Sequence, residues 1–445
     1  MDNLRPEYEA ALRTLVETPS VSSDPAHAED CRRVAERAAD LGRCMGAKAD
    51  IIETGGHPGL RLRFDSSPGA PIVAVYNHLD VQPAAARDGW SIPDAFRLEI
   101  RPGGEYIARG TTDDKGPALS ALFAAARVHA AGGGPNIHFY WEVEEEIGSP
   151  NFPVYLGAIP AAERPEVVVV SDTIWVDSET PAMPYGLRGM LTFFLRLEAA
   201  SGGPTHSGLT GGLARNPFAE LADLVSRCAD ARTGEILVPG VMDDVQLPSE
   251  AEKADFVRSG WTTEAFRAAH GLRLLRSDDP LNAMLRIWAR PTFEVHGISG
   301  GYTGPGIMTA VPPRAEAKCS MRLVPNQDPE RVFQCVRRFV AEIHPEVDLE
   351  LEACLRPFLG PRSGTYADAA SAAMKHAFGR KPTFIREGGS IGAVLQMEEA
   401  LGVPIVFMGL SLPEHHYHGI DENYSWSQAG RGIQMFEHFF RGMAD

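Results

Sequence analysis

The 445-residue chain has little cysteine and little positive charge. Its six cysteines form no C-x-x-C pair and no regular spacing, so free thiols in a reducing compartment are their expected state. Acidic residues outnumber basic residues by 59 to 42, and the resulting formal net charge of −17 disfavours binding to nucleic acid or to an anionic membrane. The sequence also has no run of about 18 apolar residues, the length that a membrane-spanning helix needs.

A secretion signal is also missing. Residues 1–17 predict an amphipathic helix with several charges, whereas a signal peptide needs an apolar stretch. We therefore expect a cytoplasmic protein that binds neither nucleic acid nor membranes. Hydrophobic residues make up 44% of the chain and charged residues 23%, a balance typical of globular proteins that excludes global disorder. At roughly 150 residues per domain, this length predicts two or three domains.

The pattern of helices and strands changes twice along the chain. Up to residue 188, helices alternate with strands, which predicts an α/β sheet covered by helices on both faces. Residues 189–357 read as strand, helix, a long irregular stretch rich in glycine and proline, strand, helix and strand, an order that resembles a ferredoxin-like α+β sandwich. The α/β pattern returns in residues 358–445. We therefore predict one discontinuous domain with a mixed sheet, formed by 1–188 and 358–445, and a smaller domain inserted at 189–357.

Carboxylates and a histidine follow three of the predicted strands. The strands and the residues after them are 72–76 with His78 and Asp80, 136–143 with Glu144, Glu145 and Glu146, and 167–170 with Asp172. A fourth acidic pair, Asp113 and Asp114, lies just before the predicted helix 115–131. Because ligands of open α/β sheets bind beyond the carboxyl ends of the strands, we expect these side chains to meet at one edge.

Each of these groups also has a structural interpretation. A histidine after a strand can be a hydrogen-bonded core residue, Asp113 and Asp114 can cap the following helix, and consecutive glutamates commonly form a solvated surface. Taken together, however, so many like charges at one sheet edge are costly to bury without cations. The combination predicts a site for two divalent ions, with either Asp113 or Asp114 as the bridging carboxylate.

The residue types at this edge suggest a division of roles. In His78-x-Asp80, the aspartate is placed to accept the second ring N–H of the histidine and to fix its tautomer. Adjacent glutamates on an extended segment point to opposite sides, so one can bind metal while its neighbour faces the substrate as a base. Histidine and carboxylate ligands suit zinc, and an oxygen-rich set also suits manganese or cobalt.

Seven motifs occur in the order known from one enzyme family. They are NHLDVQP (77–83), RGTTDDKGP (109–117), EVEEEIGSP (142–150), VVSDTIW (169–175), GLRGM (186–190), THSG (205–208) and HHYHGIDEN (415–423). By these motifs the chain resembles the co-catalytic metallopeptidases of the aminoacylase, carboxypeptidase and carnosinase type, and within them the dipeptidase-like branch. The resemblance covers nearly the whole chain, and it implies a catalytic domain with an inserted lid or dimerisation domain.

The resemblance also implies a metal-ligand set and a base. One ion would be bound by His78, Asp113 and Asp172, and the second by Asp113, Glu146 and His418. Asp80 would orient His78, and Glu145 would be the general base. Glu144 is an additional acid to which we assign no role.

The inserted domain and the C-terminal part are expected to contact the substrate. His206 matches a lid histidine that, in homodimers, reaches the partner's active site and stabilises the oxyanion. Arg322 and the loop with Gly389 and Ser390 fit a site for a substrate carboxylate, since arginine binds carboxylates through two parallel hydrogen bonds and a glycine-led helix N-terminus favours anions. Arg322 can equally be a solvated arginine of a strand.

The expected activity is hydrolysis of an amide bond in a small substrate with a free carboxylate, with a dipeptide as the first choice. An N-acyl-amino-acid amidohydrolase and a carboxypeptidase share the same motifs. A non-catalytic binding protein on this fold should have lost ligands or the base, and all of them are present. The sequence departs from the family pattern at Val143, where a small residue is usual, and in the Gly-Pro-Thr before His206. These departures and the idiosyncratic stretch 232–312 concern substrate fit.

Overall fold

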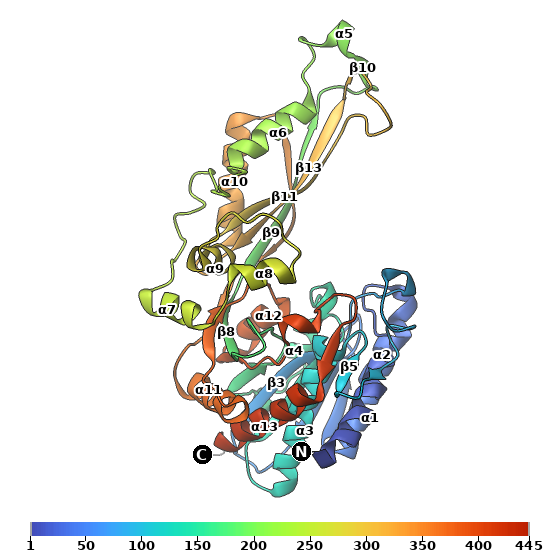
Figure 1. Ribbon diagram of the computed structural model, residues 1–445, viewed down its shortest axis with the longest axis vertical. Coiled ribbons are helices and arrows are strands. Elements are labelled where there is room, and N and C mark those ends of the chain that lie inside the picture. The colour runs from blue at the N-terminus through green and yellow to red at the C-terminus, as the bar shows by residue number, and fades with distance from the viewer. Residues whose placement is uncertain (1, 444–445) are drawn as a thin grey trace.

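The computed structural model describes residues 2–443. The molecule is elongated, with a large layered unit at one end and a narrow extension at the other (Figure 1). Both ends of the sequence contribute to the large unit, and the extension is built from the middle of the chain.

A six-stranded mixed sheet lies at the centre of the large unit. Its strand order is β1-β2-β6-β3-β7-β17. The strands are β1 (Lys48–Ile52), β2 (Gly59–Phe64), β6 (Asn136–Glu142), β3 (Ile72–His78), β7 (Val167–Val170) and β17 (Ile405–Phe407). The first two pairings, β1 with β2 and β2 with β6, are antiparallel, and the other three are parallel. The carboxyl ends of β6, β3, β7 and β17 therefore share one edge.

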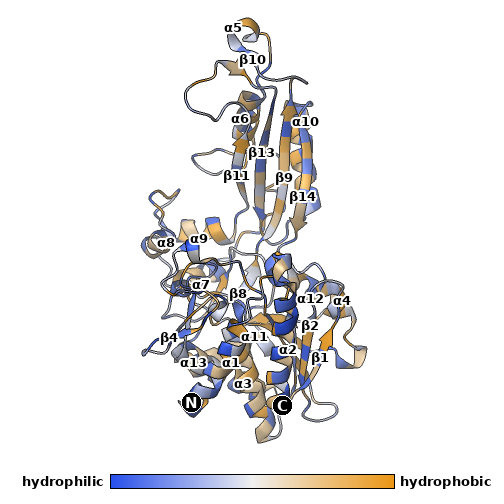
Figure 2. Cartoon of the chain, turned by 90° about the vertical axis from the view of Figure 1, so that its right-hand side faces the viewer, coloured by the Kyte–Doolittle hydropathy of each residue, from blue (hydrophilic) through white to orange (hydrophobic). Residues whose placement is uncertain are grey.

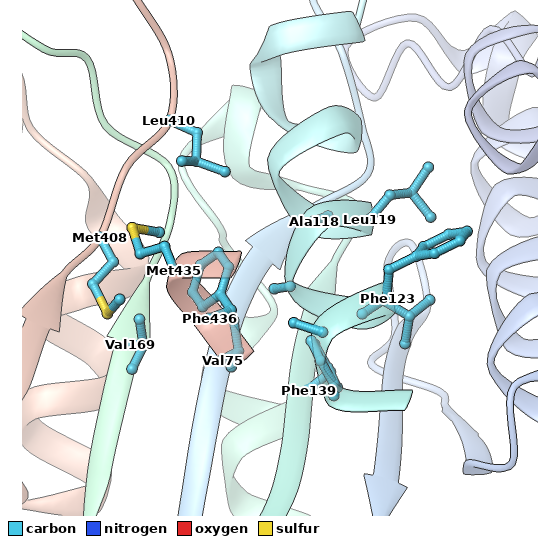
Figure 3. Packing of buried hydrophobic residues seen from close by; sticks show 14 of the residues in the cluster. Val75, Ala118, Leu119, Phe123, Phe139, Val169, Met408, Leu410, Met435 and Phe436 are labelled. Carbon is cyan, nitrogen blue, oxygen red and sulfur yellow. The ribbon is translucent and has the colours of Figure 1, made fainter. Parts of the chain in front are cut away.

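Helices cover both faces of this sheet. One face packs against α1 (Arg5–Val16), α2 (Ala28–Cys44), α3 (Gly116–Ala131), α11 (Thr365–Phe378) and α13 (Trp426–Gly442), and the other against α4 (Phe152–Gly157) and α12 (Gly392–Leu401). Along β3, Val73 and Val75 belong to the first core and Ala74 and Tyr76 to the second, which is the alternation of an extended chain. Figure 3 shows the first core, where side chains of the sheet meet those of α3 and α13.

The extension is a two-layer α+β unit with its own core. Its antiparallel sheet has the order β11-β13-β9-β14 and consists of β11 (Thr292–Ser299), β13 (Arg314–Leu323), β9 (Gly189–Glu198) and β14 (Asp348–Leu355). Every second residue of β9, from Leu191 to Leu197, is buried against α6 (Pro217–Cys228) and α10 (Pro329–Ile343). Figure 2 shows these two helices alongside the strands.

Short elements complete the two units. At the tip of the extension, β10 (Thr205–His206) pairs with β12 (Ala310–Val311) and precedes α5 (Ser207–Thr210) (Figure 1). Two three-stranded sheets flank the large sheet. They consist of β15 (Phe358–Leu359), β8 (Ala182–Leu187) and β16 (Thr383–Arg386), and of β18 (Asn423–Ser425), β5 (Glu105–Ile107) and β4 (Glu99–Ile100).

The prediction of a long irregular stretch inside 189–357, between its first helix and its second strand, is wrong for much of that segment. It contains α7 (Glu250–Arg258), α8 (Thr263–Ala269), α9 (Pro280–Trp288) and strand β11. Phe256 and Trp288 of α7 and α9 join the first core of the large unit, and Glu252 accepts a hydrogen bond of 2.7 Å from Arg386 of β16. Helices α7 and α9, which lie between α6 and β11 in the sequence, therefore pack against the large unit.

The predicted fold class is confirmed: the chain forms a mixed sheet covered by helices together with a smaller α+β unit. The exact division at 1–188, 189–357 and 358–445 stays a prediction. Among residues 2–443, no helix combines the length and the apolar character needed to cross a membrane.

Candidate metal centre

The predicted metal ligands meet at the shared edge of the parallel strands. His78 is the last residue of β3, Asp172 follows β7, and Glu146 lies in a short turn after β6. Asp113 precedes α3, and His418 comes from the loop before β18, far away in the sequence. The placement of polar groups at strand ends, inferred from the sequence, is what brings these residues together.

Asp113 lies between the two histidines. One of its oxygens, Oδ1, is 2.9 Å from Nε2 of His78, and the other, Oδ2, is 2.9 Å from Nε2 of His418. His78 Nε2 is also 3.8 Å from Oδ2 of Asp172, and His418 Nε2 is 3.2 Å from Oε2 of Glu146. A carboxylate that faces one imidazole with each oxygen has the geometry of a bridge between two ions.

The ligand atoms form two groups that are each compact enough to hold an ion. In the first group, atoms of His78, Asp114 and Asp172 lie within 4.8 Å of one another, and in the second, atoms of Asp113, Glu146 and His418 do so. Asp114 takes the place in the first group that the resemblance gives to Asp113. Oδ2 of Asp114, however, accepts a hydrogen bond of 2.7 Å from Asn77, whereas Asp113 contacts both histidines.

The electrostatics of the site fit two cations. Oδ1 of Asp114 and Oε1 of Glu146 are buried and have no hydrogen-bond donor within residues 2–443. Burial and the neighbouring carboxylates raise the pKa of Asp172 to about 6, and burial raises that of Glu145 well above its usual value. Burial lowers the pKa of His418, but Asp113 and Glu146 outweigh it and raise the value to about 10. The buried carboxylates therefore favour positive charge at this site.

Asp80 contacts both His78 and the turn that carries Glu145. Nδ1 of His78 is 3.1 Å from the main-chain oxygen of Asp80 and 3.4 Å from its carboxylate Oδ1. The same carboxylate accepts hydrogen bonds from the backbone N–H groups of Glu145, at 3.2 Å, and Glu146, at 3.0 Å. Asp80 thus fixes the imidazole and the glutamate turn relative to each other.

Glu422 is a supporting residue that belongs to the same motif as His418, HHYHGIDEN. Its fully buried carboxylate accepts four hydrogen bonds, from Nη1 of Arg109 and the backbone N–H groups of Gly110, Thr112 and Asp113, at distances of 2.9 to 3.1 Å. Arg109 in turn donates to the main-chain oxygen of His418 at 3.2 Å. Glu422 and Arg109 therefore connect the loop of Asp113 to the loop of His418.

The Glu422→Gln variant is expected to bind metal about 10–100-fold more weakly, because residues behind the ligands typically contribute that much. Both oxygens of Glu422 accept from backbone N–H groups, so a side-chain amide would turn one acceptor into a donor that faces another donor. Metal titration of the purified variant measures the effect, with Glu414→Gln in the same loop as the control. Equal affinity in both variants would contradict this role.

The structure shows what two further residues contact, Glu144 and Tyr417. Glu144, to which the sequence analysis gave no role, accepts hydrogen bonds from the backbone N–H groups of His57, at 2.8 Å, and Asn151, at 3.2 Å, and so holds the loops behind the glutamate turn. The hydroxyl of Tyr417 donates to Asp172. Tyr417 is next to His418 in the sequence, but only the folded loop shows that its side chain reaches Asp172.

The predicted substrate residues lie in two places. Nη1 of Arg322, on β13, donates to Oγ of Ser390 at 3.0 Å, and Ser390 in turn donates to the main-chain oxygen of Arg188. Gly389 is in the same loop, where its carbonyl accepts from the backbone N–H of Arg188. His206 is exposed on β10, at the end of the molecule far from β3 (Figure 1). Within one chain, His206 is therefore separated from the metal ligands.

Two histidine and carboxylate clusters, whose histidines both contact Asp113, lie at a strand edge of an α/β domain and define a hydrolase with two metal ions. A sequence model of the peptidase family M20/M25/M40 matches residues 74–442, and the chain belongs to this family. The predicted family and enzyme class are thereby confirmed.

Relatives of known identity are similar over nearly their full length. A Cys-Gly metallodipeptidase, dug1, of Schizosaccharomyces pombe is 29% identical over 98% of this chain and 95% of its own length. A human Beta-Ala-His dipeptidase is 28% identical over 96% of this chain and 88% of its own length. These relatives confirm the predicted likeness to the dipeptidase-like branch.

Solved structures give the same result for the fold. The di-peptidase Dug1p of Saccharomyces cerevisiae covers 100% of this chain and 97% of its own with a TM-score of 0.84 and 27% identity. Human carnosine dipeptidase 1 covers the same shares with a TM-score of 0.83 and 28% identity. A metallo-carboxypeptidase of the family from Sulfolobus solfataricus has a TM-score of 0.88 and 26% identity, covering 98% of this chain and 99% of its own. The fold is therefore shared by enzymes with different names.

Proposed function

We propose that the protein is a metal-dependent dipeptidase that acts on dipeptides with a free carboxylate. The observation that carries the proposal is Asp113, which faces the imidazoles of His78 and His418 at 2.9 Å each, with the buried acid Glu145 beside the pair. The names of the relatives support the same activity, since they describe a Cys-Gly metallodipeptidase and a Beta-Ala-His dipeptidase.

In this proposal Asp113 would bind both ions. His78 and Asp172 would complete the ligands of one ion, and Glu146 and His418 those of the other. Zinc is the proposed metal because it accepts both imidazole nitrogen and carboxylate oxygen, and manganese or cobalt would suit the same ligands. When bound, the ions acidify water and polarise the scissile carbonyl group.

Glu145 acts as the general base. It takes a proton from the attacking water as that oxygen adds to the carbonyl carbon, and it returns the proton to the amine nitrogen when the C–N bond breaks. Burial and the neighbouring acidic groups raise its pKa, which suits a carboxyl group that must hold a proton between the two steps. Its backbone N–H donates to Asp80, so the base is held by the residue that orients His78.

Arg322 and Ser390 form the proposed site for the substrate carboxylate, with Gly389 in the same loop. Arg188 adds a second guanidinium nearby, and among residues 2–443 neither arginine forms a salt bridge. Burial lowers the pKa of Arg188 to about 10, with the charge of Arg322 as the second cause, and burial lowers that of Arg322 as well. Two guanidinium groups that are at least half-buried and have no acidic partner are suited to bind the carboxylate of a substrate.

We also propose a homodimer that forms through the extension and completes the active site with His206 of the partner subunit. The tip near His206 exposes large apolar side chains: Leu209 is 85% exposed, Leu213 92% and Ile307 93%. Contiguous exposed apolar side chains are typical of interaction surfaces. In the dimer, the imidazole would donate to the oxygen on which negative charge develops.

The His206→Ala variant is expected to lose about 10²–10³-fold in turnover, the cost of removing one oxyanion donor, while its metal content stays unchanged. Mixing it with Glu145→Gln provides the sharper test. Each mixed dimer has one site with both Glu145 and His206 intact, so random exchange should restore about one quarter of the wild-type activity. If the mixture stays as inactive as its components, His206 does not act across a dimer.

The dipeptidase activity itself is tested with the metal-loaded protein and three substrate classes: dipeptides, N-acyl-amino acids and tripeptides. We expect dipeptides to have the highest kcat/KM. A preference for N-acyl-amino acids would indicate an amidohydrolase, and hydrolysis of longer peptides at their C-terminus would indicate a carboxypeptidase. Binding of dipeptides without any turnover would support a binding protein on this fold.

A cytoplasmic location completes the proposal. All six cysteines are free thiols, and four of them, Cys31, Cys228, Cys319 and Cys335, are buried. Burial raises the pKa of the Cys31, Cys228 and Cys319 thiols to about 12, so these side chains are unreactive core residues. Free thiols of this kind are typical of a reducing compartment.

A further inference from the structure

A large pocket lies beside the metal centre and has no role in the mechanism described so far. Its volume is about 1020 Å³, and it is bounded by α8, by the end of β16 and by the loop that precedes β18. Tyr417 forms part of its wall and donates its hydroxyl to Asp172. The pocket is therefore separated from a proposed metal ligand by a single side chain.

One wall of the pocket is aromatic and comes from residues 261–270, which lie within the stretch 232–312. The rings of Trp261 and Phe266 have centroids 5.2 Å apart, and those of Phe266 and His270 are 4.4 Å apart. Trp175 and Trp288 also line the pocket. Since this segment packs against the core of the large unit through Phe256 and Trp288, the wall is anchored to the unit that holds the metal ligands.

The pocket is also acidic. Asp177, Glu387, Glu414 and Asp421 line it, whereas its one arginine, Arg386, is paired with Glu252. Oε2 of Glu387 is buried without a hydrogen-bond donor, and within residues 2–443 this carboxylate forms no salt bridge. Burial, followed by the negative charge of Asp172, raises the pKa of Glu387 to about 8. A cation next to Glu387 would relieve this unfavourable arrangement.

Glu387 lies on the same loop as Ser390, which contacts Arg322. Three residues of extended chain span at most roughly 10–11 Å, so Glu387 and Ser390 of the proposed carboxylate site lie within this distance of each other along the chain. A dipeptide is a zwitterion with an ammonium group at one end and a carboxylate at the other. The loop thus carries one complementary group for each end.

We propose that this pocket binds the amino-terminal residue of the substrate, with its ammonium group on Glu387 and a large apolar or aromatic side chain against Trp261 and Phe266. The proposal rests on the proposed dipeptidase function and specifies its substrate class. It predicts that the protein prefers dipeptides that have a bulky hydrophobic first residue and a free amino group.

The test compares three substrates of the metal-loaded protein: Phe-Gly, Gly-Gly and 3-phenylpropionyl-glycine, which is Phe-Gly without its amino group. We expect kcat/KM for Phe-Gly to exceed that for Gly-Gly about 10–100-fold, because the aromatic wall contacts only the larger side chain. We expect a preference of about 100-fold over 3-phenylpropionyl-glycine, because Glu387 is unpaired without the ammonium group. Equal rates for all three substrates would overturn the proposal.

Two variants assign the preferences to residues. Phe266→Ala should lower kcat/KM for Phe-Gly about tenfold and leave kcat/KM for Gly-Gly within about twofold. Val154→Ala on α4, an exposed apolar residue of the large unit outside the pocket, should change neither value. Glu387→Gln should raise KM for Phe-Gly and leave KM for 3-phenylpropionyl-glycine unchanged. If either residue had a merely structural role, its variant would instead lower kcat/KM for all three substrates in parallel. This result would contradict the proposal.

A binding measurement separates the pocket from the catalytic function. Calorimetry with the metal-loaded Glu145→Gln variant records Phe-Gly binding without turnover. If Phe-Gly binds to this variant more tightly than Gly-Gly but the wild-type protein hydrolyses neither, the result contradicts the dipeptidase function and supports the pocket. If the wild-type protein hydrolyses both substrates equally well, the result supports the dipeptidase function and contradicts the pocket proposal.

Discussion

Replacement of Glu145 by glutamine is expected to lower turnover about 10²–10⁴-fold, the usual contribution of a general base, while both metal ions stay bound. Glutamine has nearly the same shape and keeps the backbone N–H that donates to Asp80, so the turn should persist. What it cannot do is take up a proton from water. The measurement is kcat at saturating dipeptide together with the metal content per chain.

The neighbouring acid supplies a matched comparison for this variant. Oε2 of Glu146 is 3.2 Å from Nε2 of His418, so Glu146→Gln should lose metal as well as activity. Glu145→Gln should lose activity alone. A Glu145→Gln variant that stays within about tenfold of wild type would show that another group removes the proton.

Removal of metal by a chelator is expected to abolish hydrolysis and to lower the melting temperature by several degrees. An ion present at 100 times its Kd stabilises the folded state by about 2.7 kcal/mol, and two ions act at this site. Without them, Asp113, Asp114, Glu146 and Asp172 remain buried next to one another and repel. Activity assays and thermal unfolding before chelation, after it and after readdition of zinc measure both effects.

A chelator already saturated with zinc is the control for this experiment, and it should change neither quantity. The prediction would be wrong if the metal-free protein, verified by elemental analysis, kept its activity. An unchanged melting temperature would show that the carboxylates are not held together by cations.

The metal centre could be predicted from the sequence because its residues follow strand ends. An apolar run such as 72–76 identifies a buried strand, and the polar residues after it must then lie at the sheet edge. The choice of Asp113 over Asp114 needed the resemblance, and the contacts of Asp113 with both imidazoles support it. His418 is distant in the sequence and could be selected only through its motif.

Other parts could not be predicted, for different physical reasons. Helix α7 carries a sequence signal that the predictions above did not use, because Ser249 and Glu252 form a capping box at its start. Glu387 carried none: an acid in a loop becomes a candidate binding residue only when the fold leaves one of its carboxylate oxygens buried without a hydrogen-bond donor. Likewise, only the tertiary structure shows that α9 packs against the large unit through Trp288.

The large unit and the extension have separate apolar cores, and the two halves of the proposed substrate site belong to different ones. Arg322 lies on β13 of the extension, whereas Glu387 follows β16 of the large unit. Contacts such as that between Arg322 and Ser390 set the orientation of one body relative to the other. A zwitterion bound at both proposed sites would therefore connect the two units, and its binding energy would favour the relative orientation at which its own length fits. A peptide too long for that separation would not reach both sites at once, so the relative position of the two units would contribute to excluding longer peptides.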